Sequence, residues 1–252
     1  MLDLKNVTLA YGAVPVLEGV DLSVAAGEFV SLVGPSGSGK TSILRAVTGL
    51  QKPLAGTVAL EVGRDEVGFL FQDDALLPWR TALENVMLGL RIRKLAKREA
   101  RERASDWLDR LGLAGLGDRY PRELSGGQRK RVAIAQVLAL SPRFLLMDEP
   151  FASLDAIVRL RITQDLLGWV ERERMSVLLV THDLEEAIQL SDQVFVLSNG
   201  PRARIRAGYR VPLQRPRDLL AARRHPAFGD LVDRLWRDLS DEMGPAFREA
   251  AE

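Results

Sequence analysis

Polar and apolar residues roughly alternate over two N-terminal stretches, residues 2–9 and 16–24. A period of two predicts half-buried strands, and we expect these two to be antiparallel. A mainly apolar run at residues 29–33 predicts a buried strand. Helical spacing of apolar residues follows it, and Gly49 stands where that helix should end. The apolar positions of this predicted helix are Ile43, Leu44, Val47 and Leu50.

The pattern after residue 50 predicts two more strands, at 57–62 and 67–71, around a turn. From residue 73 to about 141 the apolar spacing is helical, and no strong strand pattern occurs. Strands then return in alternation with helices, which indicates a parallel sheet covered by helices. These later strands are predicted at 144–147, 177–180 and 194–197, and the helices at about 156–174 and 184–190.

The C-terminal tail, 208–252, is rich in Arg and Pro and predicts one or two helices, such as one at 228–239. The sequence shows no internal repeat. With 252 residues, 46% of them apolar and 27% charged, the composition is that of an ordinary globular protein. A net charge of +1 argues against a general nucleic-acid binder. The absence of cysteine excludes disulfides and thiolate metal sites.

The N-terminus lacks the pattern of a signal peptide, and no apolar run approaches the length of a membrane span. We therefore expect any work at a membrane to depend on other chains that hold this one there. The basic stretch 91–103 is interleaved with Glu99 and Glu102. It favours a solvated helix face over contact with lipid headgroups or a membrane partner.

One stretch between the predicted strand at 29–33 and the following helix matches the phosphate-binding pattern G-x-x-x-x-G-K-[ST]. Its glycines let backbone amides surround phosphate oxygens, and the helix N-terminus adds positive potential. The lysine can reach the β- and γ-phosphates, and the threonine hydroxyl can bind Mg²⁺. The stretch is Gly34, Pro35, Ser36, Gly37, Ser38, Gly39, Lys40 and Thr41.

Polar residues follow several of the predicted strands, where ligands of open α/β sheets gather. Asp148 suits a Mg²⁺ partner, although it could instead cap the next turn. Glu149 could polarise an attacking water, and Gln72 could touch the metal or that water. His182 could contact the γ-phosphate, although a lone histidine is more often structural.

A second anion site is indicated at Leu124–Gln128, where Ser125 is a good helix N-cap. Gly126 and Gly127 leave backbone amides open at this helix start, and Gln128 ends the stretch. By physics alone, an ordinary capped helix is as good an interpretation.

Together, these motifs resemble the nucleotide-binding subunits of ATP-binding cassette (ABC) transporters, in the family's order from residue 2 to about 200. Residues 34–41 match the Walker A loop, with Ser42 beside it, and Gln72 matches the Q-loop. Residues 124–128 match the signature motif, and residues 144–148 match Walker B, with Glu149 as catalytic glutamate. The remaining matches are Ser153-Leu154-Asp155 for the D-loop, His182 for the switch histidine and Tyr11 for the adenine-stacking aromatic.

The resemblance implies an α/β P-loop ABC ATPase fold with a RecA-like parallel-sheet core, an antiparallel β-subdomain and an inserted α-helical subdomain. It implies one domain over 1–252, with the insertion at about 73–141. ATP and Mg²⁺ are the implied cofactors, and the implied metal ligands are Thr41, Gln72 and Asp148. Asp155 and Ser125 to Gln128 would contact ATP, the latter from a second copy paired head to tail.

The implied partners are a second ATPase subunit, two transmembrane permease subunits and, indirectly, a periplasmic or extracellular solute-binding protein. The implied location is the cytoplasmic face of the plasma membrane, and nucleic acid is not an implied partner. The helical subdomain would contact the permease.

Residues 71–81 and Asp148–Phe151 resemble the nitrate/sulfonate/taurine importer subfamily. Two features depart from its commonest pattern: Ala152-Ser153 stands in place of Gly-Ala, and Lys130 stands where Gln is frequent. The same resemblance extends to importers of a thiamine pyrimidine precursor and of aromatic acids, so the solute stays open. A soluble ABC ATPase without a transporter and a non-hydrolysing ATP switch are the competing hypotheses.

Overall fold

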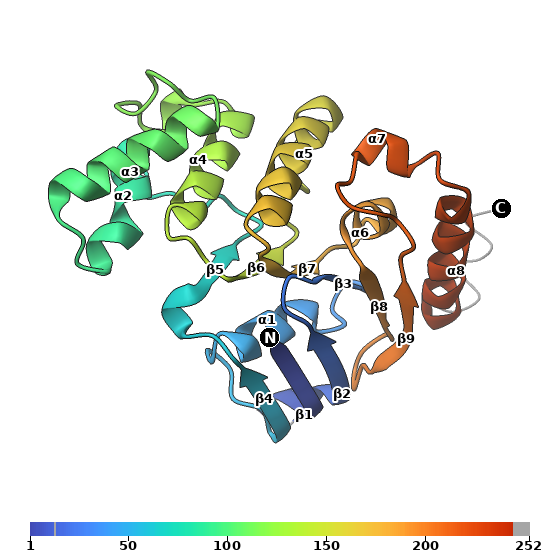
Figure 1. The fold of residues 1–252 in the computed structure, drawn as a ribbon. Helices are drawn as coiled ribbons and strands as arrows, with labels where there is room; N and C mark the ends of the chain where they lie inside the picture. Colours follow the sequence, from blue (N-terminus) through green and yellow to red (C-terminus); the bar gives the residue numbers. More distant parts are fainter. Residues whose placement is uncertain (13, 244–252) are drawn as a thin grey trace. The chain divides into compact units, whose positions relative to one another are not determined.

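The computed structural model describes residues 1–12 and 14–243, whose helices and strands are labelled in Figure 1. The chain divides into two compact units. Unit 1 comprises residues 1–64 and 167–252, and unit 2 comprises residues 65–166. Helix α5, Ala156–Arg172, contains the second boundary between them.

Unit 1 contains an antiparallel sheet with the strand order β2-β1-β4. These strands are β1 (Leu2–Tyr11), β2 (Val14–Val24) and β4 (Ala55–Leu60). Leu2 lies opposite Val24 of β2 and Leu60 of β4, so β1 is the central strand. The predicted antiparallel pairing of the two N-terminal strands is confirmed.

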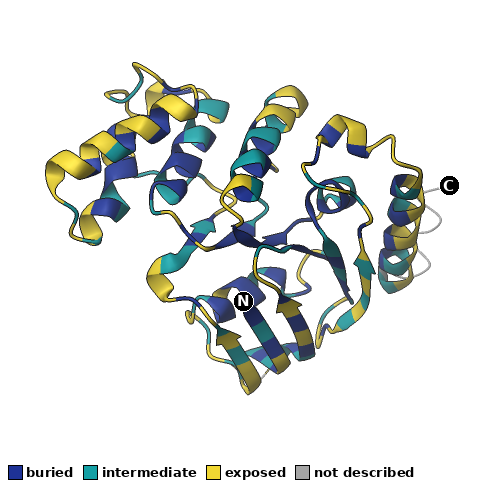
Figure 2. Cartoon of the chain, in the orientation of Figure 1, coloured by how far each residue is buried: buried dark blue, intermediate teal, exposed yellow. Residues whose placement is uncertain are grey.

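A second set of strands in unit 1 has the order β7-β3-β8-β9. Strands β7 (Ser176–Val180), β3 (Phe29–Val33) and β8 (Gln193–Leu197) are parallel, with Leu32 opposite Val180 and Phe195. Every residue of β3 and β7 is buried, as Figure 2 shows, which explains their nearly continuous apolar sequences. The polar positions within them, Ser31 and Ser176, are satisfied by hydrogen bonds.

The edge strand β9 (Ile205–Arg210) is antiparallel to β8 and was not predicted from the sequence. Its residues alternate between half-buried and exposed, but arginines occupy two outward positions and the inward positions include small Ala207. The apolar signal is therefore weak. The predicted tail, which was placed from residue 208, begins inside this strand.

The described part of the tail, up to residue 243, contains two helices, α7 (Leu219–Ala222) and α8 (Pro226–Met243). Helix α8 packs on α6 (Leu184–Leu190) and on β8 through an apolar cluster. The α8 residues of this cluster are Phe228, Leu231, Leu235 and Leu239, at the spacing of one helix face. The predicted helix at 228–239 is confirmed within longer bounds, and residues 244–252 lie outside the described part.

Helix α1 (Lys40–Val47) follows the phosphate loop, as the sequence predicted. The inclusion of Leu50 in its buried face was wrong, because Leu50 is 80% exposed. The helix ends three residues earlier, and Gly49 takes a left-handed conformation with φ of 76°. The backbone turns there, so Leu50 leaves the buried face of the helix.

Unit 2 contains a parallel strand pair, β5 (Val67–Leu70) and β6 (Phe144–Asp148), in which Leu70 lies opposite Met147. Between these strands, residues 73–141 form three α-helices and one 3₁₀ turn, with no strand. They are α2 (Ala82–Ile92), α3 (Lys97–Arg110), the 3₁₀ turn η2 (Pro121–Glu123) and α4 (Gly126–Leu138). Thr81 and Glu84 form a capping box that fixes the start of α2.

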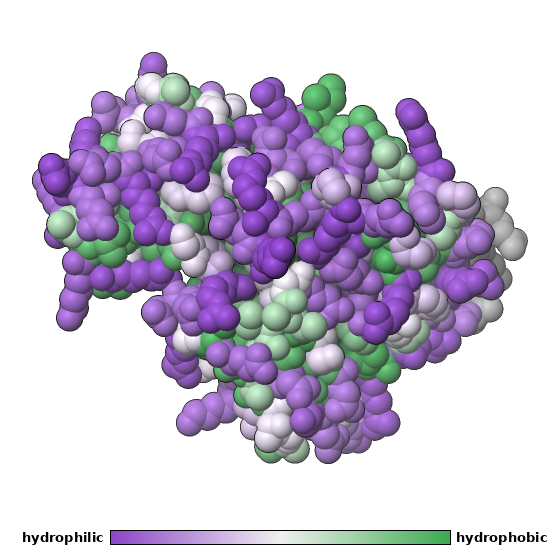
Figure 3. All heavy atoms as spheres, viewed as in Figure 1, coloured by the Kyte–Doolittle hydropathy of each residue, from purple (hydrophilic) through white to green (hydrophobic). Residues whose placement is uncertain are grey.

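The described helices include none with the length and apolar character that a membrane crossing needs. On the face drawn in Figure 3, most of the surface is hydrophilic, with smaller apolar patches between.

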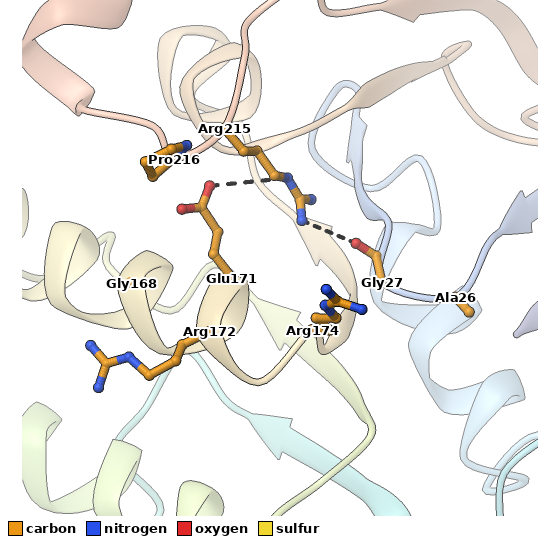
Figure 4. Close-up of a pocket in the computed structure, with 8 residues that line it drawn as sticks. All are labelled: Ala26, Gly27, Gly168, Glu171, Arg172, Arg174, Arg215 and Pro216. Carbon is orange, nitrogen blue, oxygen red and sulfur yellow. Dashed lines mark hydrogen bonds and ion pairs between the residues drawn. The ribbon is translucent and has the colours of Figure 1, made fainter.

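Asp192 holds the tail to the start of β3 in unit 1. Its carboxylate accepts hydrogen bonds from the Phe29 backbone amide at 2.8 Å and from Arg217 at 2.7 Å, and it also pairs with Arg215. The side chain of Arg217 is only 1% exposed. Burial lowers the pKa of the Arg217 guanidinium, and the charge of Asp192 counters that effect. Figure 4 shows Arg215 reaching both Glu171 and the Gly27 carbonyl.

Replacing Asp192 with alanine is expected to lower the free energy of unfolding by about 3–5 kcal/mol, because Arg217 stays buried without its carboxylate. Urea unfolding followed by circular dichroism measures this loss. Glu185→Ala is the matched control, since Glu185 and Arg223 form an exposed pair at 2.7 Å. The control should lose no more than about 1 kcal/mol. Equal losses in both variants would contradict a structural role for the Asp192 network.

Candidate functional site

The phosphate loop joins β3 to α1 in a conformation that only glycine adopts without strain at two positions. Gly37 has φ of 81° and Gly39 has φ of 92°. A Cβ at Gly39 would also come within 2.8 Å of the Val16 side chain, whereas nothing lies within 4 Å of a Cβ built on Gly37. Gly39 caps α1 without any side-chain hydrogen bond. No capping side chain therefore closes the helix start, whose positive end suits an anion.

Lys40 lies against the loop, and its side chain is largely buried. Its Nζ donates to the Gly34 carbonyl and to the Pro35 carbonyl, each at 2.8 Å. The hydroxyl of Ser38 is buried and has no hydrogen-bond partner in the described part of the chain. An open glycine backbone, an uncapped helix start and a lysine held beside them form a donor set that fits the phosphates of a nucleotide.

Tyr11 is tied to the same helix. Its hydroxyl lies 3.2 Å from the Ser42 hydroxyl and accepts a hydrogen bond from Arg45 at 2.9 Å. The contact with Ser42 lowers the pKa of the Tyr11 hydroxyl, and Arg45 acts in the same direction. The tyrosine is 51% exposed, so its ring can take a flat ligand on one face. Sequence reasoning missed Arg45, whose only signal is a basic residue in the last turn of α1.

His182 lies at the same edge of the unit 1 sheet as the phosphate loop. It follows β7, which is the parallel neighbour of β3, and the Thr181 amide donates to the Leu32 carbonyl at 3.3 Å. Asp183 caps α6 by accepting from the Glu186 amide at 3.0 Å. The exposed His182 is therefore placed by a rigid strand end and a capped helix.

Unit 2 places Gln72 and Asp148–Glu149 at the carboxyl ends of two neighbouring parallel strands. Gln72 follows β5 by two residues, and Asp148 ends β6. Glu149 has φ of 44°, a left-handed conformation that is uncommon for a residue with a side chain. Backbone strain of this kind concentrates at functional sites, where the surrounding structure holds it in place.

The predicted second anion site forms a capped helix start in unit 2. Ser125 accepts from the Gln128 amide at 3.3 Å, and the Gln128 side chain accepts from the Ser125 amide at 2.9 Å. This capping box confirms Ser125 as the N-cap of α4. Ser125 and Gly126 are exposed. A Cβ on Gly127 would meet Val158 at 2.7 Å, so this position requires close packing on α5.

Asp155 caps the start of α5, since its carboxylate accepts from the Val158 amide at 3.0 Å. A nucleotide contact by Asp155, as the family resemblance implies, would have to add to this cap.

Of the predicted metal ligands, Thr41 lies in unit 1, and Gln72 and Asp148 lie in unit 2. Within residues 1–12 and 14–243 there is no group of three or more His, Asp or Glu suited to hold a metal ion. Mg²⁺ ligation by these three residues stays a prediction that needs phosphate oxygens to complete it.

A cavity of about 950 Å³ in unit 1 lies away from this chemistry (Figure 4). Its lining includes Gly27 and Arg174, which precede β3 and β7, whereas the phosphate loop and His182 follow those strands. The cavity is therefore at the amino ends of the strands, and Arg215 and Glu171 occupy its wall.

Comparison with known proteins identifies the family. Residues 17–152 match the profile described as ABC transporter. The aliphatic sulfonates import ATP-binding protein SsuB of Burkholderia ambifaria is 42% identical, over 98% of this chain and 75% of the relative. The protein named SsuB 1 of Paracoccus denitrificans is 41% identical, over 94% and 93% of the two chains. The chain belongs to the ABC transporter family.

A solved structure of a dimeric ATP-binding cassette, in a post-hydrolysis state with ADP and phosphate, is 35% identical, with a TM-score of 0.73. It covers 85% of this chain and 100% of that one. The expected ABC ATPase fold is therefore confirmed. As an ABC ATP-binding subunit, the protein is an ATPase whose hydrolysis is coupled to transport.

Proposed function

We propose that this ABC ATPase is the ATP-hydrolysing subunit of an importer and that its phosphate loop binds ATP at the start of α1, where Lys40 lies. The observation that supports this most directly is the loop itself, with left-handed Gly37 and Gly39 and an uncapped helix start. Tyr11 stacks on the base, and Thr41 binds Mg²⁺ with Gln72 and Asp148. When bound, Mg²⁺ neutralises charge on the phosphates.

In this proposal Glu149 orients and polarises the attacking water, and His182 contacts the γ-phosphate. Both assignments fit residues at strand ends, where the backbone geometry fixes the position of the Cα atom that carries the side chain. Such positioning supplies much of the catalysis in phosphoryl transfer, because little covalent chemistry is left to the protein.

The helix start at Ser125–Gln128 closes over ATP that a second copy holds. Its exposed N-terminus suits an anion, since the capping box uses only part of its donors. A head-to-tail dimer gives this second anion site a ligand, and hydrolysis of ATP then releases the two copies.

Ser125→Arg is expected to keep ATP binding and to lower turnover by at least about tenfold, since a bulky cation displaces the helix start from the γ-phosphate. Phosphate release at saturating ATP measures turnover, and equilibrium titration measures binding. Ser105→Arg introduces the same change at an exposed position of α3 and should leave both unchanged. Normal turnover of Ser125→Arg would show that this helix start takes no part in hydrolysis.

The solute proposed is a small oxyanion or sulfonate, such as an alkanesulfonate, taurine or nitrate. Support comes from relatives named as aliphatic sulfonate importers at 41% and 42% identity over nearly the whole chain. Transport assays on the reconstituted importer, with alkanesulfonate, nitrate and an aromatic acid compared, test this. Uptake of the aromatic acid alone would favour the alternative solute class.

The proposed partners are a second copy, two permease subunits and an external solute-binding protein, and the proposed place is the cytoplasmic membrane face. Purification of a tagged chain from its own membranes should recover a polytopic permease in one-to-one ratio. If the chain is recovered without any membrane protein, the alternative of a soluble ABC ATPase is favoured.

A further inference from the structure

Lys130 is a buried lysine in the second turn of α4, and its side chain is 1% exposed. A buried ammonium is unfavourable unless all three of its donors find partners. Here Nζ lies 2.9 Å from the Asp74 carboxylate, 3.0 Å from the Gln72 carbonyl and 3.4 Å from the Phe71 carbonyl. The lysine is therefore fully satisfied, and every partner belongs to the segment that carries Gln72.

A second buried side chain also holds the segment between β5 and α2, residues 71–81. Its far end is held by Asn85, which is fully buried and bonds backbone groups of Leu77, Arg80 and Thr81. Between the two anchors, Ala75 has φ of 52°, and Trp79 is 70% exposed. A left-handed residue in an exposed segment persists only where neighbouring contacts hold it.

Lys130 connects two segments that carry proposed site residues. Gln72 lies on the segment that the lysine binds, and Ser125–Gln128 begins the helix that carries the lysine. Lys130 is five residues beyond Ser125, about 7.5 Å along a helix axis. An α-helix transmits a displacement over that length with little bending.

We propose that Lys130 is a positioning residue that makes the Gln72 segment and the Ser125–Gln128 helix start move as one body. This deepens the function proposed above and rests on it. If bound ATP drew Gln72 toward it, the Gln72 carbonyl and Asp74 contacts of Lys130 would carry that movement into α4, and the helix start would reach the neighbouring copy's nucleotide at the same time. Lys130 itself touches no reacting atom.

A glutamine at this position would not make the same contacts as the lysine. A glutamine amide can donate to the Gln72 carbonyl, but it is shorter and has no charge to hold Asp74. Arg129 also approaches Asp74, at 3.5 Å, but it is 40% exposed and bonds no group of Gln72. The ammonium of Lys130 is therefore the contact that joins Asp74 and Gln72 to one helix.

The test uses Lys130→Met, which keeps the stem and removes the charge, with Lys130→Gln as partial rescue. Arg131→Met is the matched control, because Arg131 lies on the same helix and pairs with Asp165 at 3.3 Å, not with the Gln72 segment. Lys130→Met should lower kcat about tenfold and change the KM for ATP by less than about threefold, as for mutations along a coupling network. Lys130→Gln should recover part of kcat, and Arg131→Met should keep it within about twofold.

Hydrogen exchange without nucleotide provides a readout that does not depend on ATPase activity. In Lys130→Met, amides of residues 72–77 should exchange about tenfold faster, while those of the phosphate loop stay unchanged. Asp74→Asn should accelerate exchange of the same amides. The double variant, Asp74→Asn with Lys130→Met, should exchange no faster than either single variant.

Two results would overturn the proposal. The first is a kcat for Lys130→Met equal to that of Arg131→Met. The second is a Lys130→Met protein whose kcat and ATP affinity fall by the same factor, in proportion to the fraction of protein that is unfolded. Failure of the proposed function looks different. In that case the parent protein itself does not hydrolyse ATP, while the exchange measurement still reports whether Lys130 holds the Gln72 segment.

Discussion

Lys40→Ala is expected to weaken ATP binding by at least about 100-fold, because a charge-assisted phosphate contact of roughly 1.5–3 kcal/mol is lost together with loop order. The structure adds the second part of this effect. Lys40 bonds the Gly34 and Pro35 carbonyls, so its removal leaves two carbonyls of the loop without these donors. Titration of a fluorescent ATP analogue measures the dissociation constant, and turnover should fall in parallel.

Lys5→Ala is the control for loss of a lysine in the same unit. Lys5 is 73% exposed and forms an ion pair with Asp3 at 2.9 Å, away from the phosphate loop. Its removal should leave the dissociation constant unchanged. If Lys40→Ala binds ATP as tightly as Lys5→Ala does, the phosphate loop is not the nucleotide site, and the proposed function fails at its first step.

Glu149→Gln is expected to lower turnover by about 10²–10⁴-fold, the range in which a positioned general base contributes. The amide keeps the shape of the side chain but cannot accept a proton from water. ATP binding should persist, because Glu149 is assigned to the water rather than to the phosphates. Trapped ATP should then hold two copies together, since neither can hydrolyse the nucleotide that joins them.

Steady-state phosphate release and size-exclusion chromatography at saturating ATP measure the two parts of this prediction. Glu173→Gln, an exposed position after α5, makes the same chemical change away from the strand ends and should leave turnover and size unaffected. A Glu149→Gln protein that remains monomeric with ATP bound would contradict the head-to-tail dimer. One that hydrolyses normally would remove Glu149 from the catalytic role.

Much of the local chemistry could be predicted because it depends on neighbours along the chain. The phosphate loop needs glycines and a lysine at fixed spacing between a buried strand and a helix, and each of these features can be recognised in the sequence. The Ser125 cap can be recognised for the same reason, since a capping box joins two residues that are three positions apart in the sequence, here Ser125 and Gln128. The remaining polar residues of the site follow predicted parallel strands, so the sequence also predicts that they lie at the carboxyl ends of those strands.

Other features depend on residues far apart in the chain, which no local pattern displays. Lys130 follows Gln128 by two residues and shares a helix face with Ile134 and Leu138. This spacing predicts that Lys130 is buried, but it does not predict which residue pairs with it. The partner lies 56 residues earlier, at Asp74. Two arginines of the tail, Arg215 and Arg217, likewise pair with a distant residue, Asp192, which precedes β8.

The sequence by itself determined the family, the strand-loop-helix around the phosphate site and the residue types that the chemistry needs, because these depend on short-range order and composition. The tertiary structure alone decided that β9 completes the edge of the unit 1 sheet and that α8 packs on β8. It also decided that a buried lysine joins the Gln72 segment to α4. The physical reason is that burial of charge and pairing of strands are settled by contacts between distant segments, whose free energies appear only when the chain has folded.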